Sequence, residues 1–125
     1  LYYQNALGPP DKKKIISRLR GYHEVTITSG SLTGMDYARK GFDLPRPHMI
    51  HAEAPHYFRE ALPVESEEAF TGILADSLEH LILKENPDTI AAMIAEPVQG
   101  AGGVIIPPRN ISRRSSRFFE NNRSS

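Results

Sequence analysis

The clearest pattern of apolar and polar positions predicts a helix over residues 67–85. Its apolar side chains recur at steps of three and four, which places them along one face of a helix: Phe70, Ile73, Leu74, Leu78, Leu81 and Ile82. Ser66 suits the N-cap position, and the two glutamates that follow it suit the positive end of the helix dipole. Asn86-Pro87 ends the pattern.

A nearly continuous apolar run over residues 89–95 predicts a buried parallel strand. Glu96 stands at its carboxyl end, before Pro97 and a glycine-rich turn over residues 100–103. Residues 14–20 predict an earlier short strand, and residues 104–106 another. Because strand, irregular crossover, helix and strand follow in this order, the chain is predicted to have an α/β fold.

The other segments are less regular. Residues 1–7 read as the end of a helix that Gly8 terminates, and residues 25–32 fit either a strand or a short helix. Residues 41–63 contain four prolines and are predicted to be largely irregular.

The composition argues against several classes of function. The chain has 125 residues, equal numbers of acidic and basic side chains, and no cysteine. This length fits one domain or part of one, and zero net charge gives no field that would attract nucleic acid or an anionic membrane. No apolar run approaches the roughly 18 residues that span a bilayer. We therefore expect a cytoplasmic protein with no nucleic-acid and no membrane partner.

The neutral total conceals a basic segment after Pro108. Residues 109–125 hold five arginines and one glutamate, and they lack a clean apolar period. We predict that residues 1–108 form the folded part and that residues 109–125 form a basic, disordered tail. Three interpretations of the tail stay open: a natural basic arm that binds RNA or is phosphorylated, an exposed terminus without a defined role, or a stretch translated in a shifted reading frame.

Several residues are candidates for chemistry. Glu96 ends an apolar strand beside a glycine turn, which fits either a functional carboxylate or an exposed strand end. Tyr22-His23 follows a strand and offers an aromatic platform with a proton-transfer group, although a packed tyrosine fits as well. The cluster His48, His51, Glu53 and His56 lies in a proline-rich loop without helical spacing, so no metal site is predicted.

Two blocks carry a specific resemblance. The first is Tyr22-His23 after Lys14–Arg18, followed by Ser31-Leu32-Thr33-Gly34; the second is Ile94-Ala95-Glu96-Pro97-Val98-Gln99-Gly100-Ala101-Gly102-Gly103-Val104. Together they resemble class III pyridoxal-phosphate-dependent aminotransferases, most of all the omega-amino acid:pyruvate type. The likeness runs from Tyr2 to Pro108 and covers about a quarter of a complete family enzyme.

The resemblance implies a fold, a reaction and three site residues. The chain would be a fragment of the large pyridoxal 5'-phosphate-binding domain of a fold-type I aminotransferase. The parent, a homodimer, would transfer an amino group from an amine or omega-amino acid to an oxo acid such as pyruvate. Tyr22 would stack on the cofactor ring, His23 would shape the pocket behind it, and Glu96 would support the aspartate that pairs with the ring nitrogen.

Two departures from the family pattern qualify this reading. The family motif is Tyr-His-Gly, but Glu24 stands in the place of the glycine. No lysine of this chain falls in the context of the Schiff-base lysine, so we assign no catalytic residue and expect the chain to be inactive alone. The alternatives are a non-enzymatic truncated gene product and a small α/β binding module.

Overall fold

A parallel sheet forms the centre of the fold. The computed structural model describes residues 2–8, 11–63 and 66–121. Its strands are β1 (Lys14–Arg18), β2 (Met49–Ala52) and β3 (Ile90–Met93). They lie in the order β2-β1-β3, and both neighbours run parallel to β1. The carboxyl ends of β1 and β3 therefore lie at the same edge of the sheet.

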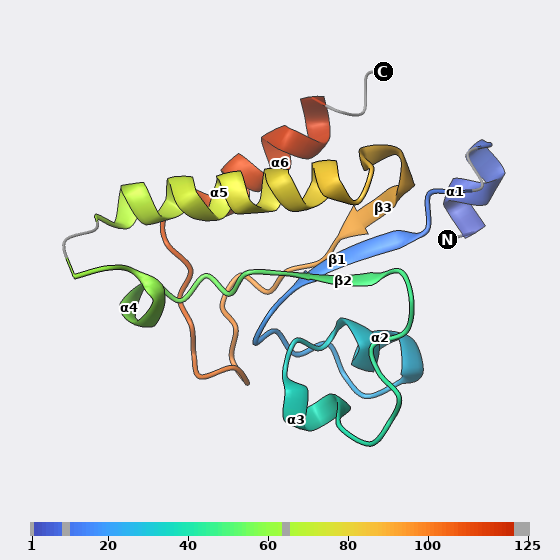
Figure 1. The fold of residues 1–125 in the computed structure, drawn as a ribbon, viewed down its shortest axis with the longest axis horizontal. Helices are drawn as coiled ribbons and strands as arrows, with labels where there is room; N and C mark the ends of the chain where they lie inside the picture. The colour runs from blue at the N-terminus through green and yellow to red at the C-terminus, as the bar shows by residue number, and fades with distance from the viewer. Residues whose placement is uncertain (1, 9–10, 64–65, 122–125) are drawn as a thin grey trace.

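Helices cover both faces of this sheet. They are α1 (Tyr2–Leu7), α2 (Ile27–Leu32), α3 (Asp36–Arg39), α4 (Tyr57–Glu60), α5 (Glu67–Lys84), the 3-10 helix η1 (Pro87–Thr89) and α6 (Ile111–Asn121). Figure 1 shows α5 and α6 along one face, with α2 and α3 on the other. This layered arrangement confirms the predicted α/β fold class. Within the described residues, no helix combines the length and the apolarity that crossing a membrane requires.

The predicted long helix is confirmed as α5, and its apolar stripe forms the core. Leu78 and Ile82 pack against the sheet in a cluster with Ile16, Ala52 and Ile90. The side chain of Ser66 accepts a hydrogen bond from Ala69 N at 3.1 Å, as an N-cap should. Ile73 differs from the expectation, because it remains 54% exposed. The buried stripe is thus narrower than the periodicity indicates.

Two polar contacts fix β1 between the helical layers. Lys14 Nζ donates to a carboxylate oxygen of Glu85 at 2.9 Å and to its backbone oxygen at 2.6 Å, which joins the start of β1 to the end of α5. On the other face, Ser17 Oγ donates to Leu32 O at 2.7 Å. Because Ser17 is fully buried, this bond also satisfies a hydroxyl that would otherwise be costly to bury.

The sequence of residues 25–32 fits either a strand or a short helix, and the structure forms the helix α2 (Ile27–Leu32), with a reciprocal capping box between Thr26 and Ser29 at its start. The proline-rich stretch 41–63 is largely irregular as predicted, apart from α4 and β2, whose four residues pair with β1. One segment differs from expectation. The expected strand at residues 104–106 is reduced to one bridge between Ile105 and Gln99.

The basic segment after Pro108 also differs from expectation, since residues 111–121 form the helix α6 instead of a disordered tail. Ile111 is 2% exposed and packs against Phe70 and Leu74 of α5. At the junction, Arg109 N donates to the Glu67 carboxylate at 2.7 Å. Ile111 therefore docks the start of a helix whose composition alone predicts disorder. The division of the chain at residue 108 stays a prediction.

Candidate functional site

The loops that leave β1 and β3 meet at the carboxyl edge of the sheet. Tyr22 N donates to Glu96 Oε1 at 2.7 Å, across 74 residues of sequence. Gly100 N donates to the other carboxylate oxygen at 3.3 Å. Each oxygen of Glu96 therefore accepts a backbone hydrogen bond from a different loop, and the structure brings together residues that sequence reasoning placed in one site. This edge is where ligands bind in open α/β sheets.

Tyr22 and His23 lie on a loop whose backbone is hydrogen-bonded to the side chain of Thr33. His23 N donates to Thr33 Oγ1 at 3.0 Å, and that hydroxyl in turn lies 3.1 Å from the backbone oxygen of Glu24. Thr33 is 1% exposed, whereas Tyr22 remains 36% exposed. The loop backbone is thus anchored in the interior while the tyrosine stays accessible to a ligand.

Gln99 is a site residue that sequence reasoning did not select. Its side chain is 1% exposed, and Nε2 donates to Leu19 O at 3.0 Å, which ties the turn after β3 to the end of β1. Its backbone also pairs with Ile105 in both directions. Within the described residues, Gln99 Oε1 is buried without a hydrogen-bond partner. In the sequence, Gln99 could have been noticed as a single amide side chain among the apolar and glycine residues of the turn after β3.

Gly34 and Gly102 let their turns pack closely against the backbone at the carboxyl end of β1. A Cβ added at Gly34 would lie 2.2 Å from Arg18 O, and one added at Gly102 would lie 2.3 Å from Arg20 O. No other residue fits either position without moving the backbone. The glycines of both resemblance blocks therefore hold the turns against the end of β1.

Glu24 occupies a backbone conformation that favours glycine. Its φ is +78°, in the left-handed region. Its side chain is exposed. Glu24 therefore stands in the place of the family glycine at a position where the backbone conformation strains any residue that has a Cβ.

The histidine-rich loop does not gather into a cluster. His56 Nδ1 lies 3.3 Å from Arg20 Nη1, while His51 packs beside Arg39. Burial, helped by the Arg39 charge, lowers the pKa of His51 below its ordinary 6.5. Among the described residues, no group of three acidic or imidazole side chains is placed to hold a metal ion.

The site combines an accessible tyrosine, two loops braced by one carboxylate, and glycine turns packed against a strand end. An accessible aromatic side chain at this edge of the sheet suits a flat heteroaromatic ligand. The sequence supplied Tyr22, His23 and Glu96, and the structure adds Gln99, Gly34 and Gly102.

Comparison with known proteins gives concordant matches. A family model described as Aminotransferase class-III matches residues 1–122. Gamma aminobutyrate transaminase 1, mitochondrial, of Solanum lycopersicum is 59% identical over 107 residues. Gamma-aminobutyrate transaminase 1, mitochondrial, of Oryza sativa subsp. indica is 58% identical over 108 residues. Each match covers 86% of this chain and 21% of the relative, so the chain spans about a fifth of the length of these curated relatives.

Solved structures match over nearly the whole chain. The omega transaminase from Pseudomonas jessenii in complex with PMP superposes with a TM-score of 0.94 at 52% identity. It covers 96% of this chain, which corresponds to 26% of that structure. A structure described as "Transaminase with L-ala" gives a TM-score of 0.93, also at 52% identity, and the match spans 28% of it.

Proposed function

Because the chain belongs to the class-III aminotransferase family, we propose that it forms one wall of the pyridoxal 5'-phosphate pocket of a transaminase. This membership confirms the resemblance carried by the two sequence blocks, and with it the fold class. In the proposed reaction, an amino group passes from an amine or omega-amino acid to an oxo acid such as pyruvate. Since the chain spans about a fifth of its curated relatives, the reaction is assigned to the parent polypeptide and not to this chain alone.

The observation that carries this proposal is the double hydrogen bond of Glu96. It fixes the Tyr22 loop against the β3 loop at the edge where the cofactor would lie. The residues present fit this cofactor. Tyr22 is 36% exposed and so accessible for stacking on a pyridine ring, and a Cβ added at Gly100 or Gly103 of the turn after β3 would meet no atom within 4 Å. Pyridoxal phosphate, when bound, supplies an electron sink for the transamination.

We assign Glu96 a positioning role. Both of its oxygens accept backbone hydrogen bonds, so its carboxylate stabilises loop geometry directly. The sequence-based hypothesis that Glu96 supports the aspartate beside the ring nitrogen stays a prediction. His23 is assigned to the pocket wall, because its backbone is fixed by Thr33.

The remaining assignments also belong to this proposal. The parent would be a homodimer that acts on small amino and oxo-acid substrates, with no nucleic-acid or membrane partner. We propose the cytoplasm as its compartment, although the two relatives described above carry "mitochondrial" in their names. No residue of this chain is proposed to bond covalently to the cofactor.

A chimera tests the proposal. Residues 1–108 replace the corresponding part of the Pseudomonas jessenii omega transaminase, and cofactor retention and amination of pyruvate are measured. We expect both to be retained. A folded chimera that loses cofactor and activity would favour the non-enzymatic or binding-module alternative.

The Glu96→Gln variant of this chimera tests the positioning role. An amide can accept only one of the two backbone hydrogen bonds, so about 1.5–3 kcal/mol is lost, which weakens cofactor binding roughly ten- to a hundred-fold. The matched control is Glu53→Gln, because Glu53 is exposed and forms no ion pair within the described residues. Equal cofactor affinity in the two variants would remove Glu96 from the site.

A further inference from the structure

Glu24 keeps a strained backbone conformation beside the proposed cofactor site. Its φ of +78° lies in the left-handed region, where glycine avoids a cost that every residue with a Cβ bears. The family motif has glycine at this position, so the strain comes with the glutamate of this chain. Backbone outliers of this kind cluster at active sites and ligand clamps. This directs attention to the exposed carboxylate that Glu24 brings to the loop.

The loop holds Glu24 at a fixed place close to Tyr22. Thr33 Oγ1 accepts a hydrogen bond from His23 N at 3.0 Å and donates to the backbone oxygen of Glu24 at 3.1 Å. Thr33 is 1% exposed, so its hydroxyl anchors both residues from the interior. Because two residues of chain span at most about 7 Å, the Cα of Glu24 lies no farther than that from the Cα of Tyr22. The carboxylate of Glu24 therefore belongs to the surroundings of the side chain that is proposed to stack on the cofactor.

The charge of Glu24 is not neutralised within the described part of the chain. Neither of the ion pairs found there involves its exposed carboxylate. The site's other carboxylate, Glu96, accepts backbone hydrogen bonds on both oxygens, and the side chain of Arg20 lies 3.3 Å from His56 Nδ1. Glu24 thus contributes a negative charge that is available to a substrate arriving at the Tyr22 loop.

We propose that Glu24 determines the choice of amino donor: its carboxylate favours donors whose far end carries a second ammonium group and disfavours donors whose far end carries a carboxylate. The inference rests on the proposed function and deepens it, because it names the class of donor that the Tyr22 site prefers. A donor with an uncharged far end stands between the two classes. 4-Aminobutyrate belongs to the disfavoured class, and it is the compound that the names of the two curated relatives carry.

The expected discrimination is modest, because the carboxylate of Glu24 is exposed. Two unit charges about 7 Å apart in water change an equilibrium constant about three-fold. Relative to the uncharged donor, Glu24 should therefore help a diamine about three-fold and hinder a carboxylate donor about three-fold, which separates the two about ten-fold. At about 1 M salt the screening length falls to about 3 Å, so this contribution of Glu24 should vanish.

Donors of equal carbon number test the inference in the chimera that carries residues 1–108. The donors are 1-aminobutane, 1,4-diaminobutane and 4-aminobutyrate, and pyruvate is the acceptor throughout. The kcat/KM of each charged donor is divided by that of 1-aminobutane, at low and at high salt. Glu24→Gln keeps the Cβ and the length of the side chain but removes the charge. At low salt it should lower the diamine ratio about three-fold and raise the 4-aminobutyrate ratio about three-fold.

Two further variants separate the charge of Glu24 from other effects. Glu24→Asp keeps the carboxylate and should retain part of the discrimination. Glu79→Gln removes a carboxylate from an exposed position of α5, so it is the matched control and should leave both ratios unchanged.

A second arm uses the Pseudomonas jessenii omega transaminase with glutamate placed at the position that aligns with Glu24. The same donors should show the opposite changes of Glu24→Gln, with a higher diamine ratio and a lower 4-aminobutyrate ratio. This arm separates the two proposals. A chimera that is inactive with every donor would overturn the proposed function, whereas the transplanted glutamate still reports on the choice of donor.

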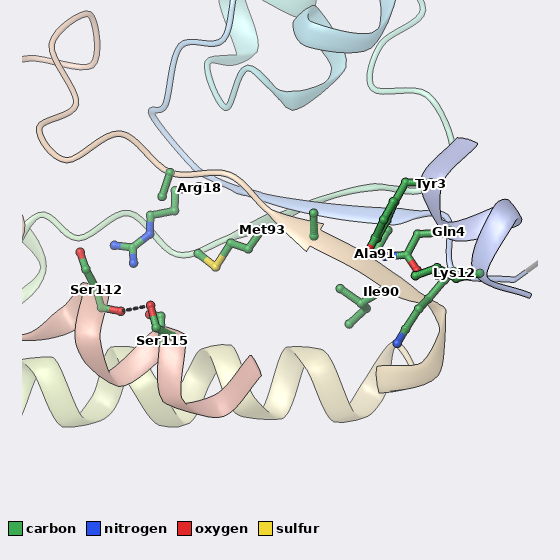
Figure 2. Close-up of a pocket in the computed structure, with 13 residues that line it drawn as sticks. Tyr3, Gln4, Lys12, Arg18, Ile90, Ala91, Met93, Ser112 and Ser115 are labelled. Carbon is green, nitrogen blue, oxygen red and sulfur yellow. Dashed lines mark hydrogen bonds between the residues drawn. The ribbon is translucent and has the colours of Figure 1, made fainter. Parts of the chain in front are cut away.

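The melting temperature of the 125-residue chain gives a readout that needs no cofactor. Glu24 lies apart from the cavity of about 1000 Å³ beside β3, which Arg18 lines together with Ser112 and Ser115 of α6 (Figure 2). Since no residue of the Tyr22 loop is among its described lining residues, a change at Glu24 leaves that packing in place. Glu24→Gly should raise the melting temperature by relieving the strain, and in the chimera it should remove the discrimination between donors as Glu24→Gln does.

Three results would overturn the inference. The first is that Glu24→Gln leaves both donor ratios unchanged in an active chimera, or that the transplanted glutamate changes neither. The second is that Glu79→Gln shifts the ratios as much as Glu24→Gln does, which would trace the discrimination to the net charge of the surface. The third is that the effect of Glu24→Gln persists undiminished at about 1 M salt, because an exposed charge must be screened there.

Discussion

Replacing Glu24 by glycine should stabilise the fold. Glu24 has a φ of +78°, and its backbone oxygen accepts a hydrogen bond from the buried Thr33 hydroxyl at 3.1 Å. The backbone therefore keeps this conformation whatever side chain is present. The Cβ of Glu24 contributes strain there, and no described ion pair involves its exposed carboxylate.

The size of the effect follows from two opposing terms. A left-handed conformation costs an L-residue about 1–2 kcal/mol relative to glycine. Glycine loses about 0.5–1 kcal/mol more conformational entropy on folding than other residues do. The difference predicts a gain of about 0.5–1 kcal/mol in the free energy of unfolding. For a domain of this size, that corresponds to a rise of roughly 3 °C in melting temperature.

Urea unfolding followed by circular dichroism measures this gain. Glu24→Ala is the matched control, because it removes the charge but keeps the Cβ, and it should leave the free energy of unfolding within about 0.5 kcal/mol of the parent. Glu79→Gly, in the middle of α5, should instead destabilise by about 1 kcal/mol. The strain argument fails if Glu24→Gly destabilises the chain, or if Glu24→Ala stabilises it equally.

Three further predictions concern the fold around the site. The lowered pKa of His51 means that the unfolded chain binds a proton more readily, so stability should fall as the pH drops below about 6.5; His51→Gln should flatten that dependence in a series of urea titrations. Gly34→Ala should cost at least about 2 kcal/mol because its Cβ would meet a backbone oxygen, whereas Gly100→Ala, with open space around it, should be close to neutral by thermal melting. Ile111→Ala should cost about 2–4 kcal/mol if α6 is docked as described, and the exposed Arg113→Ala should cost under about 0.5; equal effects would mean that α6 does not pack on α5.

The sequence predicted those elements that are determined by residues close together in the chain. The long helix followed from apolar spacing around Leu74 and Leu78, and β3 followed from an apolar run that ends at a turn. The resemblance to the aminotransferase family implied that Glu96 and Tyr22 belong to one site, and a 2.7 Å hydrogen bond joins them at the carboxyl edge of the parallel sheet.

What the sequence could not predict depends on contacts between distant segments. β2 has only four residues, and pairing with β1, not its own composition, makes it a strand. The helix α6 depends on a space beside Phe70 that Ile111 fills.

The hydrogen bond from Tyr22 to Glu96 also sets an order of events during protein synthesis. The two residues are 74 positions apart, so the tyrosine leaves the ribosome well before its carboxylate partner exists. Bringing together two residues that far apart in sequence costs more chain entropy than forming a contact between sequence neighbours. The Tyr22 loop therefore lacks its hydrogen bond to Glu96 until β3 has paired with β1. A nascent chain arrested before Glu96 would expose this loop to proteases, and one arrested well beyond Gly100 would protect it.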